Sequence, residues 1–518
     1  PGVTGLVTPI KTAYWNHTPM LLVTPQAANK TMGQGGFQEV EQMNLFKDMV
    51  CYQEEVRDPS RMAEVLNRVI EKSIRGSAPA QINVPRDYWT QVIDIELPPI
   101  VRLERSAGGV SAVTEAAKLL SNAKFPVILS GAGVVLGNAI EDCKKIAEKL
   151  DAPVCSGYQH NDSFPGSHPL AVGPLGYNGS KAAMELISKA DVVLALGTRL
   201  NPFSTLPGYE IDYWPKKASI IQVDINSDRI GLTKKVTVGI CGDAKLVAQQ
   251  ILAKLSAKAG DTDREKRKAL IHQTKSAWLQ MLSSLDHEED DPGTVWNKEA
   301  RERDKDRMSP RMAWRAIQAG LPEDVIISSD IGNNCAIGNA YPTFEKGRKY
   351  LAPGLFGPCG YGFPSILGAK IGCPDTPVIG FAGDGAFGIS MSEMSSCARK
   401  EWPKISMVIF RNYQWGAEKR NSILWFDNNF VGTELDPELS YAKVANACGL
   451  KGITVKTMEE TTKTIKQSCE DQKKGITTFI EVILNQELGE PFRRDAMKKP
   501  VKVAGINKAD MKPQKPII

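Results

Sequence analysis

Short apolar runs alternate with longer amphipathic stretches along this chain, a pattern that predicts parallel β-strands connected by helices. Near the start, Met20–Val23 has the composition of a buried strand, and residues 61–72 form an amphipathic stretch without Pro or Gly, which predicts a helix. Further along, apolar runs at Pro126–Leu129, Asp191–Leu196 and Ile220–Asp224 alternate with helical patterns. These three runs predict strands of one doubly wound sheet.

Length and composition indicate an α/β protein with more than one domain, because 518 residues of which 42% are hydrophobic can bury several cores. We expect doubly wound parallel-sheet domains with boundaries at residues 1–100, 105–257 and 308–485, a charged linker at 258–307 and a basic tail at 486–518. The charge density of the linker predicts a solvated helix rather than a core. The proline-spaced tail predicts either a surface arm or disorder.

The overall charge argues against a nucleic-acid partner, because the net charge is only +5 and the Lys and Arg residues are scattered. No run approaches the roughly 18 apolar residues of a membrane helix, so no membrane partner is expected. Ten cysteines without a CxxC pair are typical of reduced thiols. We therefore expect a cytoplasmic protein.

The most informative motif is Gly383-Asp384-Gly385-Ala386, followed by the apolar run Ile405–Phe410 and then by Asn412-Tyr413-Gln414. The apolar run predicts a buried parallel strand, which places Asp384 and Asn412 at the carboxyl ends of neighbouring strands. Magnesium prefers oxygen ligands and takes one or two carboxylates while phosphates complete its octahedron. The glycines permit close backbone approach, and a helix predicted from Ala386 to Arg399 would direct its N-terminal amides at a diphosphate. Two plain turns are the alternative for these segments.

This pairing resembles the signature of thiamine diphosphate enzymes. The resemblance implies that Mg²⁺ is bound by the Asp384 side chain, the Asn412 side chain and the backbone carbonyl of Gln414, and that Trp415 and Gly416 belong to the cofactor site. In two respects the chain departs from the family pattern. Arg411 occupies the place of the first Asn of the family's Asn pair, and the spacer is one residue longer than in the common decarboxylases.

Other segments resemble cofactor-binding parts of the acetolactate synthase-like members of this family. One contains Asn333 and Asn334 after a predicted strand, and another contains Cys359 and Tyr361 in a Gly- and Pro-rich stretch. Cys359 stands where many members place a bulky apolar residue that bends the cofactor, with a buried structural thiol as the alternative. Glu418, six residues after Asn412, matches an acid that several decarboxylases use, so it would relay protons to a bound carbonyl. A solvent-facing residue at the start of a helix is the alternative.

Cations and amides near these motifs are candidate contacts for the anionic groups of a substrate, because an anion needs such donors. We assign Lys419 and Arg420 to this role, with solvated surface charge as the alternative. The loop Gly33–Glu41 resembles the family's Phe-Gln-Glu loop, which implies substrate contacts from Gln34 and Phe37 and a catalytic role for Gln38. An ordinary surface loop is the alternative here. Among the histidines, His17 is placed near the substrate.

The glycine segment Ser130–Val134 directly follows a predicted strand and resembles half of a dinucleotide-binding fingerprint. The third glycine is displaced to Gly137, and Asp224 lies far beyond the expected acid position. Glycine turns of this kind are common without a ligand, so a nucleotide is not expected in the second domain.

Three long blocks, residues 11–19, 24–39 and 411–421, resemble the branch of the family that cleaves sulfoacetaldehyde. The resemblance covers nearly the whole chain as Pyr-type, central and PP-type domains, the first apparently lacking its N-terminal part. It implies thiamine diphosphate and Mg²⁺ as cofactors, and conversion of sulfoacetaldehyde and phosphate to acetyl phosphate and sulfite through enamine and acetyl intermediates. It also implies a homodimer or homotetramer. The family's activating glutamate is expected upstream of Pro1.

Two alternatives stay open beside this function. An acetolactate synthase-like carboligase or a sulfopyruvate-type decarboxylase would share the cofactor but require a 2-oxo acid. A non-catalytic subunit that binds thiamine diphosphate is the second alternative.

Overall fold

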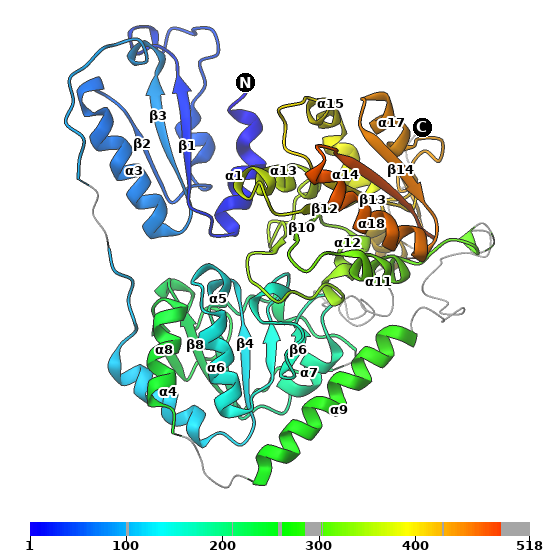
Figure 1. Cartoon of the computed structure of the whole chain (residues 1–518). Helices are drawn as coiled ribbons and strands as arrows, with labels where there is room; N and C mark the ends of the chain where they lie inside the picture. The colour runs from blue at the N-terminus through cyan, green and yellow to red at the C-terminus, as the bar shows by residue number, and fades with distance from the viewer. Residues whose placement is uncertain are drawn as a thin grey trace. The chain divides into compact units, whose positions relative to one another are not determined.

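The computed structural model describes residues 1–99, 103–209, 211–256, 262–284, 302, 304–426 and 429–487 (Figure 1). It divides the chain into two units, each of which is described by itself. The first unit comprises Pro1–Glu104 and Pro353–Pro358, and the second comprises Arg105–Ala352 and the described residues from Cys359 onward. The basic tail expected at 486–518 lies outside the described residues except for its first two positions.

The first unit is built on a three-stranded parallel sheet in the order β1-β3-β2. Its elements are α1 (Val7–Trp15), β1 (Met20–Gln26), α2 (Gln42–Phe46), β2 (Tyr52–Glu55), α3 (Met62–Gly76) and β3 (Pro79–Pro85). Strand β3 is buried at every residue, and α3 contributes Val65 and Val69 to the same core, so the helix predicted at 61–72 is confirmed. The expectation that Met20–Val23 is wholly buried is wrong, because β1 lies at a sheet edge and buries Leu22 while the other three residues are exposed.

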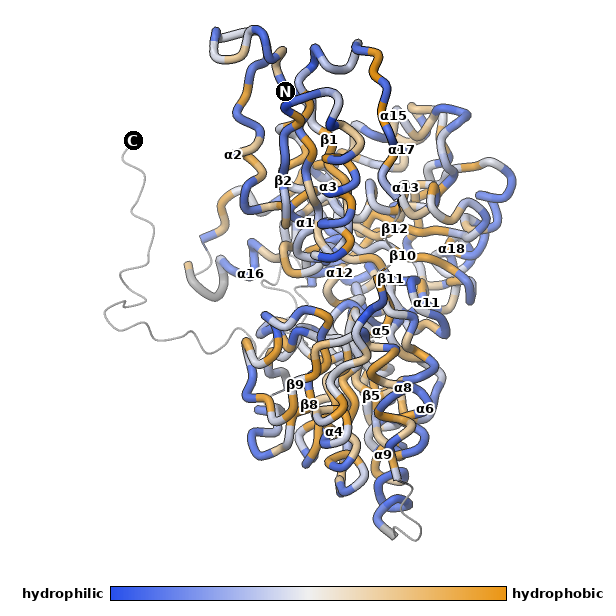
Figure 2. The backbone as a smooth tube through the Cα atoms, turned by 90° about the vertical axis from the view of Figure 1, so that its left-hand side faces the viewer, coloured by the Kyte–Doolittle hydropathy of each residue, from blue (hydrophilic) through white to orange (hydrophobic). Residues whose placement is uncertain are grey.

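The central part of the second unit is a six-stranded parallel sheet in the order β6-β5-β4-β7-β8-β9. Its strands are β4 (Pro126–Ser130), β5 (Val154–Ser156), β6 (Ala171–Pro174), β7 (Val192–Leu196), β8 (Ser219–Asp224) and β9 (Val238–Cys241), and its helices are α4 (Val110–Asn122), α5 (Ala132–Leu136), α6 (Ile140–Leu150), α7 (Lys181–Ile187) and α8 (Ala244–Lys254). The three strands predicted from apolar runs are therefore confirmed as β4, β7 and β8. Figure 2 shows hydrophobic residues concentrated where the strands of this sheet lie.

The C-terminal part of the second unit is a second six-stranded parallel sheet, in the order β11-β10-β12-β13-β15-β14. Its strands are β10 (Ile326–Ser329), β11 (Tyr350–Leu351), β12 (Val378–Gly383), β13 (Ser406–Arg411), β14 (Lys451–Val455) and β15 (Thr478–Ile483), and its helices are α11 (Pro310–Gly320), α12 (Asn333–Ile337), α13 (Gly362–Gly372), α14 (Asp384–Ser390), α15 (Met394–Cys397), α16 (Gly416–Trp425), α17 (Tyr441–Ala447) and α18 (Met458–Lys473). Strands β12 and β13 are hydrogen-bonded neighbours in the middle of this sheet.

Helix α9 (Thr262–Ser284) follows the central sheet and corrects the expected solvated linker. It buries Ile271 against the core of the central sheet and Trp278 and Leu282 against the core of the C-terminal sheet. Its Arg267 is also buried and donates to the backbone carbonyl oxygens of Lys124, Leu150 and Asp151. Helix α9 therefore contacts both cores in spite of its many charged residues, because its apolar residues recur at helical spacing and share one face.

A polar contact also joins the two sheets of the second unit. Asn161 donates its side-chain amide to the backbone oxygen of Asn339, at 2.8 Å. Next to it, the buried Asp162 carboxylate accepts hydrogen bonds from the backbone N–H groups of Lys349 (2.9 Å) and Tyr350 (3.3 Å). Burial raises the pKa of Asp162 to about 6, although these hydrogen bonds act in the opposite direction.

Among the described helices, none combines the length and the apolar character that a membrane span requires.

Asp162 provides a prediction on stability and pH. Because its pKa is higher in the folded protein than the ordinary value of 3.8, the folded state favours the protonated form, and stability from this group is lost as the pH rises through about 6. Asp162→Asn should therefore gain stability relative to the parent protein between pH 4 and pH 7.5, by at most about 3 kcal/mol. Thermal unfolding of both proteins across this pH range measures the difference. The exposed Asp228 supplies the control variant Asp228→Asn, and a pH-independent difference for Asp162→Asn would contradict the assignment.

Candidate active site

The acidic and amide side chains of the predicted metal motif lie at the carboxyl ends of two neighbouring strands, as expected. Strand β12 ends at Gly383 and Asp384 begins α14, while β13 ends at Arg411 and Asn412 follows directly. The register pairs Gly383 with Phe410, which brings the two strand ends level with each other. Asp384 and Asn412 are both buried.

The helix expected from Ala386 to Arg399 is interrupted. Helix α14 ends at Ser390, a 3-10 turn covers Met391–Glu393, and α15 continues from Met394. Gly and Ser residues of low helix propensity in this stretch account for the break. The start of the helix, which carries the motif, is where the sequence predicted it.

The two oxygens of the Asp384 carboxylate differ in the number of hydrogen bonds they accept. Its Oδ2 accepts from Arg411 Nη1 at 3.0 Å and from the backbone N–H of Tyr413 at 2.7 Å. Its Oδ1 accepts from the N–H of Gly385 at 3.0 Å. A carboxylate oxygen has two lone pairs, so Oδ1 keeps one for another partner. Burial raises the pKa of Asp384 to about 6, while the Arg411 charge and the Tyr413 N–H act against this rise, so the group is mostly ionised at neutral pH.

The loop between β13 and α16 holds the other predicted metal ligand. Tyr413 has a left-handed backbone (φ 60°), which turns the chain sharply after Asn412. Its carbonyl accepts from the N–H of Leu435 at 2.9 Å, and the N–H of Trp415 donates to Thr433 at 2.8 Å. Gln414 donates its side-chain amide to the backbone of Gln486 at 3.1 Å. The position of the Gln414 carbonyl is thus set by pairing to a neighbouring segment.

Close packing joins this loop to the glycine motif and to α12. A Cβ atom on Gly385 would lie 2.9 Å from the ring of Trp415, and a Cβ atom on Gly416 would lie 3.0 Å from the side-chain nitrogen of Asn333. Residues that follow β12, β13 and β10, and that the sequence assigned to the cofactor, therefore pack against one another.

Asp330, at the end of β10, is a site residue that sequence reasoning did not single out. Its carboxylate accepts from the N–H groups of Gly360 (3.1 Å) and Gly362 (2.7 Å), and so fixes the loop that carries Cys359 and Tyr361. Burial raises the pKa of Asp330 to about 6. An acid directly after a buried strand and a Gly-rich segment further along the chain were the signals that could have suggested this contact.

Glu418 and Cys359 lie in the same electrostatic environment. Partial burial, with smaller contributions from Asp330 and Glu418, raises the pKa of the Cys359 thiol to about 11. Glu418 is exposed in the first turn of α16, and Cys359 is exposed rather than a buried structural thiol. Burial also raises the pKa of Tyr361, on the same loop as Cys359, to about 12.

The two cations after Glu418 are not solvated surface charges, so that alternative is wrong. Lys419 is fully buried and its ammonium group pairs with Glu434 and reaches Gln486 Oε1 at 3.4 Å. Arg420 is buried as well. The ion pair of Lys419 links α16 to Glu434, which lies in the segment 433–435 that also forms backbone hydrogen bonds with Tyr413 and Trp415.

The remaining predicted substrate residues belong to the first unit. Phe37 is 86% exposed, and Gln38 and His17 have left-handed backbones (φ 62° and 55°). Gln34 donates weakly to the Lys30 carbonyl at 3.5 Å. The Glu39 carboxylate accepts from the N–H groups of Gly33 and Gly36, which orders the loop. Their roles stay predictions.

The residues at this sheet edge suit a divalent cation with a diphosphate. Gly332 and Gly383 face open space, since a Cβ atom on either would meet nothing within 4 Å. Within the described residues, the buried side-chain oxygens Asn334 Oδ1 and Gln414 Oε1 accept no hydrogen bond. In the described part of the chain, no group of three or more His, Cys, Asp or Glu side chains is arranged to hold a metal ion.

The glycine segment of the central sheet has a packing role. A Cβ atom on Gly131 would lie 2.5 Å from the carbonyl oxygen of Gly197, and one on Gly133 would lie 2.6 Å from the Gly197 Cα. The two loops after β4 and β7 approach so closely that side chains are excluded. Backbone packing therefore explains the resemblance to a dinucleotide fingerprint.

Comparison with known proteins gives matches over most of the chain. Residues 113–251 match the family "Thiamine pyrophosphate enzyme, central domain", and residues 330–482 match "Thiamine pyrophosphate enzyme, C-terminal TPP binding domain". A probable sulfoacetaldehyde acetyltransferase of Rhizobium meliloti is 77% identical over 99% of this chain and 87% of its own length. The sulfoacetaldehyde acetyltransferase of Roseovarius nubinhibens is 74% identical over 99% of this chain and 85% of its own. A probable acetolactate synthase large subunit of Methanocaldococcus jannaschii is 30% identical over 90% and 78%.

The contact between Gly385 and Trp415 leads to a prediction on stability. Gly385→Ala should lower the free energy of unfolding of the cofactor-free protein by about 1–3 kcal/mol, because the added methyl group meets the indole ring. The thermal unfolding midpoint, which is measured, should fall accordingly. Gly383→Ala is the matched control, since that site has free space and an ordinary φ of −69°, and should change stability by no more than about 0.5 kcal/mol. Equal effects of the two substitutions would contradict the packing described.

Proposed function

The chain belongs to the sulfoacetaldehyde acetyltransferase family of thiamine pyrophosphate enzymes, and on this premise we propose that it converts sulfoacetaldehyde and phosphate to acetyl phosphate and sulfite. The observation that carries the proposal is 77% identity over 515 residues to a relative named for this activity. The pairing of Asp384 and Asn412 at neighbouring strand ends supports it independently.

Thiamine diphosphate and Mg²⁺ are the proposed cofactors. The ion would be held by Asp384 Oδ1, the Asn412 side chain and the Gln414 carbonyl. The other residues proposed to contact the cofactor are Asn333, Asn334, Cys359, Tyr361, Gly383, Gly385, Ala386, Trp415 and Gly416. When bound, thiamine diphosphate supplies the carbon nucleophile that lets a C–S bond break and an acetyl group pass to phosphate.

The protein's own part is to hold charge and move protons. Asp384 keeps a negative charge at a buried strand end, where a divalent cation would neutralise it. Glu418 is proposed to exchange protons with the bound carbonyl, supported by its influence on the Cys359 thiol, which stands in the position of the family's cofactor wedge. A catalytic role is also proposed for Gln38 of the first unit.

The substrate contacts proposed are Gln34, Phe37 and His17 in the first unit, and Lys419 and Arg420 on α16. For Arg420 the proposal rests on the planar guanidinium, whose paired N–H donors match the oxygens of a sulfonate or a phosphate. The ion pair of Lys419 with Glu434 favours an indirect role, in which Lys419 holds α16 in place.

Three further proposals concern the assembly of the protein, its location and an alternative reaction. The active protein is proposed to be a homodimer or homotetramer. A cytoplasmic location is proposed because all ten cysteines are described and none forms a disulfide. The relatives named acetolactate synthase, at about 30% identity, support the alternative of a carboligase or decarboxylase acting on 2-oxo acids.

The proposal predicts that purified full-length protein releases sulfite from sulfoacetaldehyde only when phosphate, thiamine diphosphate and Mg²⁺ are all present, with one acetyl phosphate per sulfite. Sulfite is measured colorimetrically and acetyl phosphate as its hydroxamate, with each component omitted in turn. Turnover of pyruvate or sulfopyruvate without any sulfoacetaldehyde cleavage would instead establish the 2-oxo acid alternative.

A pair of acid-to-amide variants tests the metal assignment in the same assay. Asp384→Asn should raise the Mg²⁺ concentration for half-maximal activity by about 10- to 100-fold, as expected for losing a charged partner worth about 1.5–3 kcal/mol. Asp375→Asn removes an exposed acid between α13 and β12 and should leave the Mg²⁺ requirement unchanged. An unchanged Mg²⁺ requirement in Asp384→Asn would refute the assignment of the metal site.

A further inference from the structure

Arg411 brings a permanent positive charge into the predicted metal site. It ends β13, directly before Asn412, and its side chain is only 1% exposed. A cation beside a metal-binding carboxylate should weaken metal binding unless another charge balances it. The surroundings of Arg411 are therefore informative about how this site works.

Both terminal nitrogens of the Arg411 guanidinium group donate hydrogen bonds. Nη1 donates to Asp384 Oδ2 at 3.0 Å, and Nη2 donates to the backbone oxygens of Leu439, at 2.9 Å, and Asp436. Its central carbon lies 4.2 Å from the centre of the Tyr413 ring, at cation–π distance. The group thus joins the metal-binding carboxylate to the backbone of the 436–439 segment.

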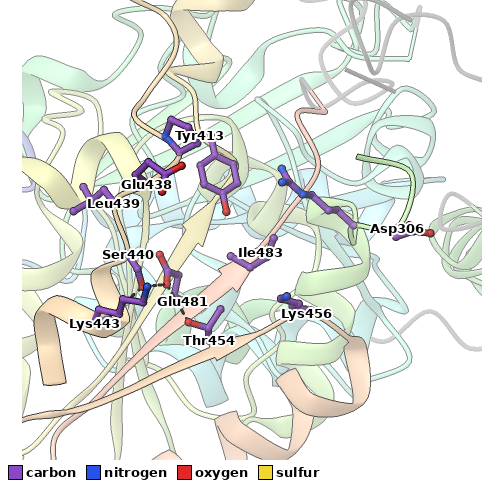
Figure 3. A pocket seen from close by; sticks show the side chains of 12 residues that line it. Asp306, Tyr413, Glu438, Leu439, Ser440, Lys443, Thr454, Lys456, Glu481 and Ile483 are labelled. Atoms are coloured by element: carbon purple, nitrogen blue, oxygen red, sulfur yellow. Dashed lines mark hydrogen bonds between the residues drawn. The ribbon is translucent and has the colours of Figure 1, made fainter. Parts of the chain in front are cut away.

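Glu481 balances the charge of Arg411. Its carboxylate is buried and lies 3.7 Å from Arg411 Nε. It accepts hydrogen bonds from the side chains of Ser440 (2.7 Å) and Thr454 (3.1 Å) and from the N–H of Tyr441 (3.2 Å). Figure 3 shows Glu481 pointing toward Ser440 and Thr454. These three residues and Tyr413 line a cavity of about 480 Å³. With Arg411 and Glu481 compensating each other, Asp384 retains one net negative charge for a metal ion.

The same contacts limit how Asp384 can bind an ion. Arg411 and the Tyr413 N–H together occupy both lone pairs of Oδ2, which leaves the one lone pair of Oδ1. A carboxylate held in this way can bind a metal through one oxygen but not through two. Mg²⁺ has an octahedral shell that suits single-oxygen carboxylate binding, whereas the larger Ca²⁺ takes six to eight ligands and often both oxygens of a carboxylate.

We propose that Arg411 is a positioning residue that makes Asp384 a single-oxygen ligand and thereby selects Mg²⁺ over Ca²⁺, with Glu481 compensating its charge. This inference rests on the proposed Mg²⁺ site at Asp384. A merely structural Arg411, one that only fastens the 436–439 segment, would affect both ions equally. The ratio of the two affinities therefore separates selection from structural support.

The test is isothermal titration calorimetry of the full-length protein with MgCl₂ and with CaCl₂, using the same excess of thiamine diphosphate in cell and syringe. The parent protein should bind Mg²⁺ at least about tenfold more tightly than Ca²⁺. Equal affinities would overturn the role of Arg411 while leaving the metal site intact. Absence of binding by either ion would overturn the metal site itself, so the two failures are distinguishable.

Two variants separate the effect of occupying Asp384 Oδ2 from the effect of the Arg411 charge. In Arg411→Met/Glu481→Gln the buried charges are removed together, so that neither is left unpaired. One lone pair of Asp384 Oδ2 then becomes free for a metal, while the Tyr413 N–H keeps the other. The ratio of Mg²⁺ to Ca²⁺ affinity should fall at least about tenfold. Glu481→Gln alone keeps Arg411 on Oδ2 but leaves its charge uncompensated, so both affinities should fall by a similar factor.

An unchanged affinity ratio in the double variant, with the thermal unfolding midpoint preserved, would overturn the proposal. A changed ratio in Glu481→Gln alone would do so as well, because that variant leaves Oδ2 occupied. If the double variant does not fold, the parent protein and the single variant still decide, since each has an outcome that the proposal forbids.

Discussion

The active site depends on keeping one carboxylate ionised inside a buried strand end. Burial alone would hold Asp384 in its neutral form, and an ionised acid without partners would be costly. The Arg411 guanidinium and the N–H of Tyr413 lower that cost, and Glu481 in turn balances Arg411. A divalent cation, which can bind a diphosphate at the same time, is the natural counterpart of the negative charge that remains.

The fold supplies the geometry that this charge requires. Parallel strands β12 and β13 end level with each other, which brings Asp384 and Asn412 together at one edge. Gly385 has no side chain and so allows the ring of Trp415 to pack against the start of α14. Asp330 fixes the neighbouring loop by accepting backbone N–H groups. Each contact limits movement around the one position where a diphosphate would lie.

Much of this arrangement could be predicted from the sequence because its signals are local. The apolar runs predicted β4, β7, β8 and β13, and the spacing from Asp384 to Asn412 placed the two proposed metal ligands at adjacent strand ends. The contacts that depend on distant partners could not be predicted. Glu481 lies 70 residues from Arg411 in the sequence, so its role in charge balance appears only when β15 pairs with β13. For the same reason the burial of α9 was missed, because its apolar residues contact two different cores.

The measurement that tests the account most directly is a crystal structure of the protein with Mg²⁺ and thiamine diphosphate bound. The account predicts an octahedral ion bound by Asp384 Oδ1, the Asn412 side-chain oxygen and the Gln414 carbonyl, with Asp384 Oδ2 still hydrogen-bonded to Arg411. An ion held by both Asp384 oxygens, or one located away from Asp384, would contradict it.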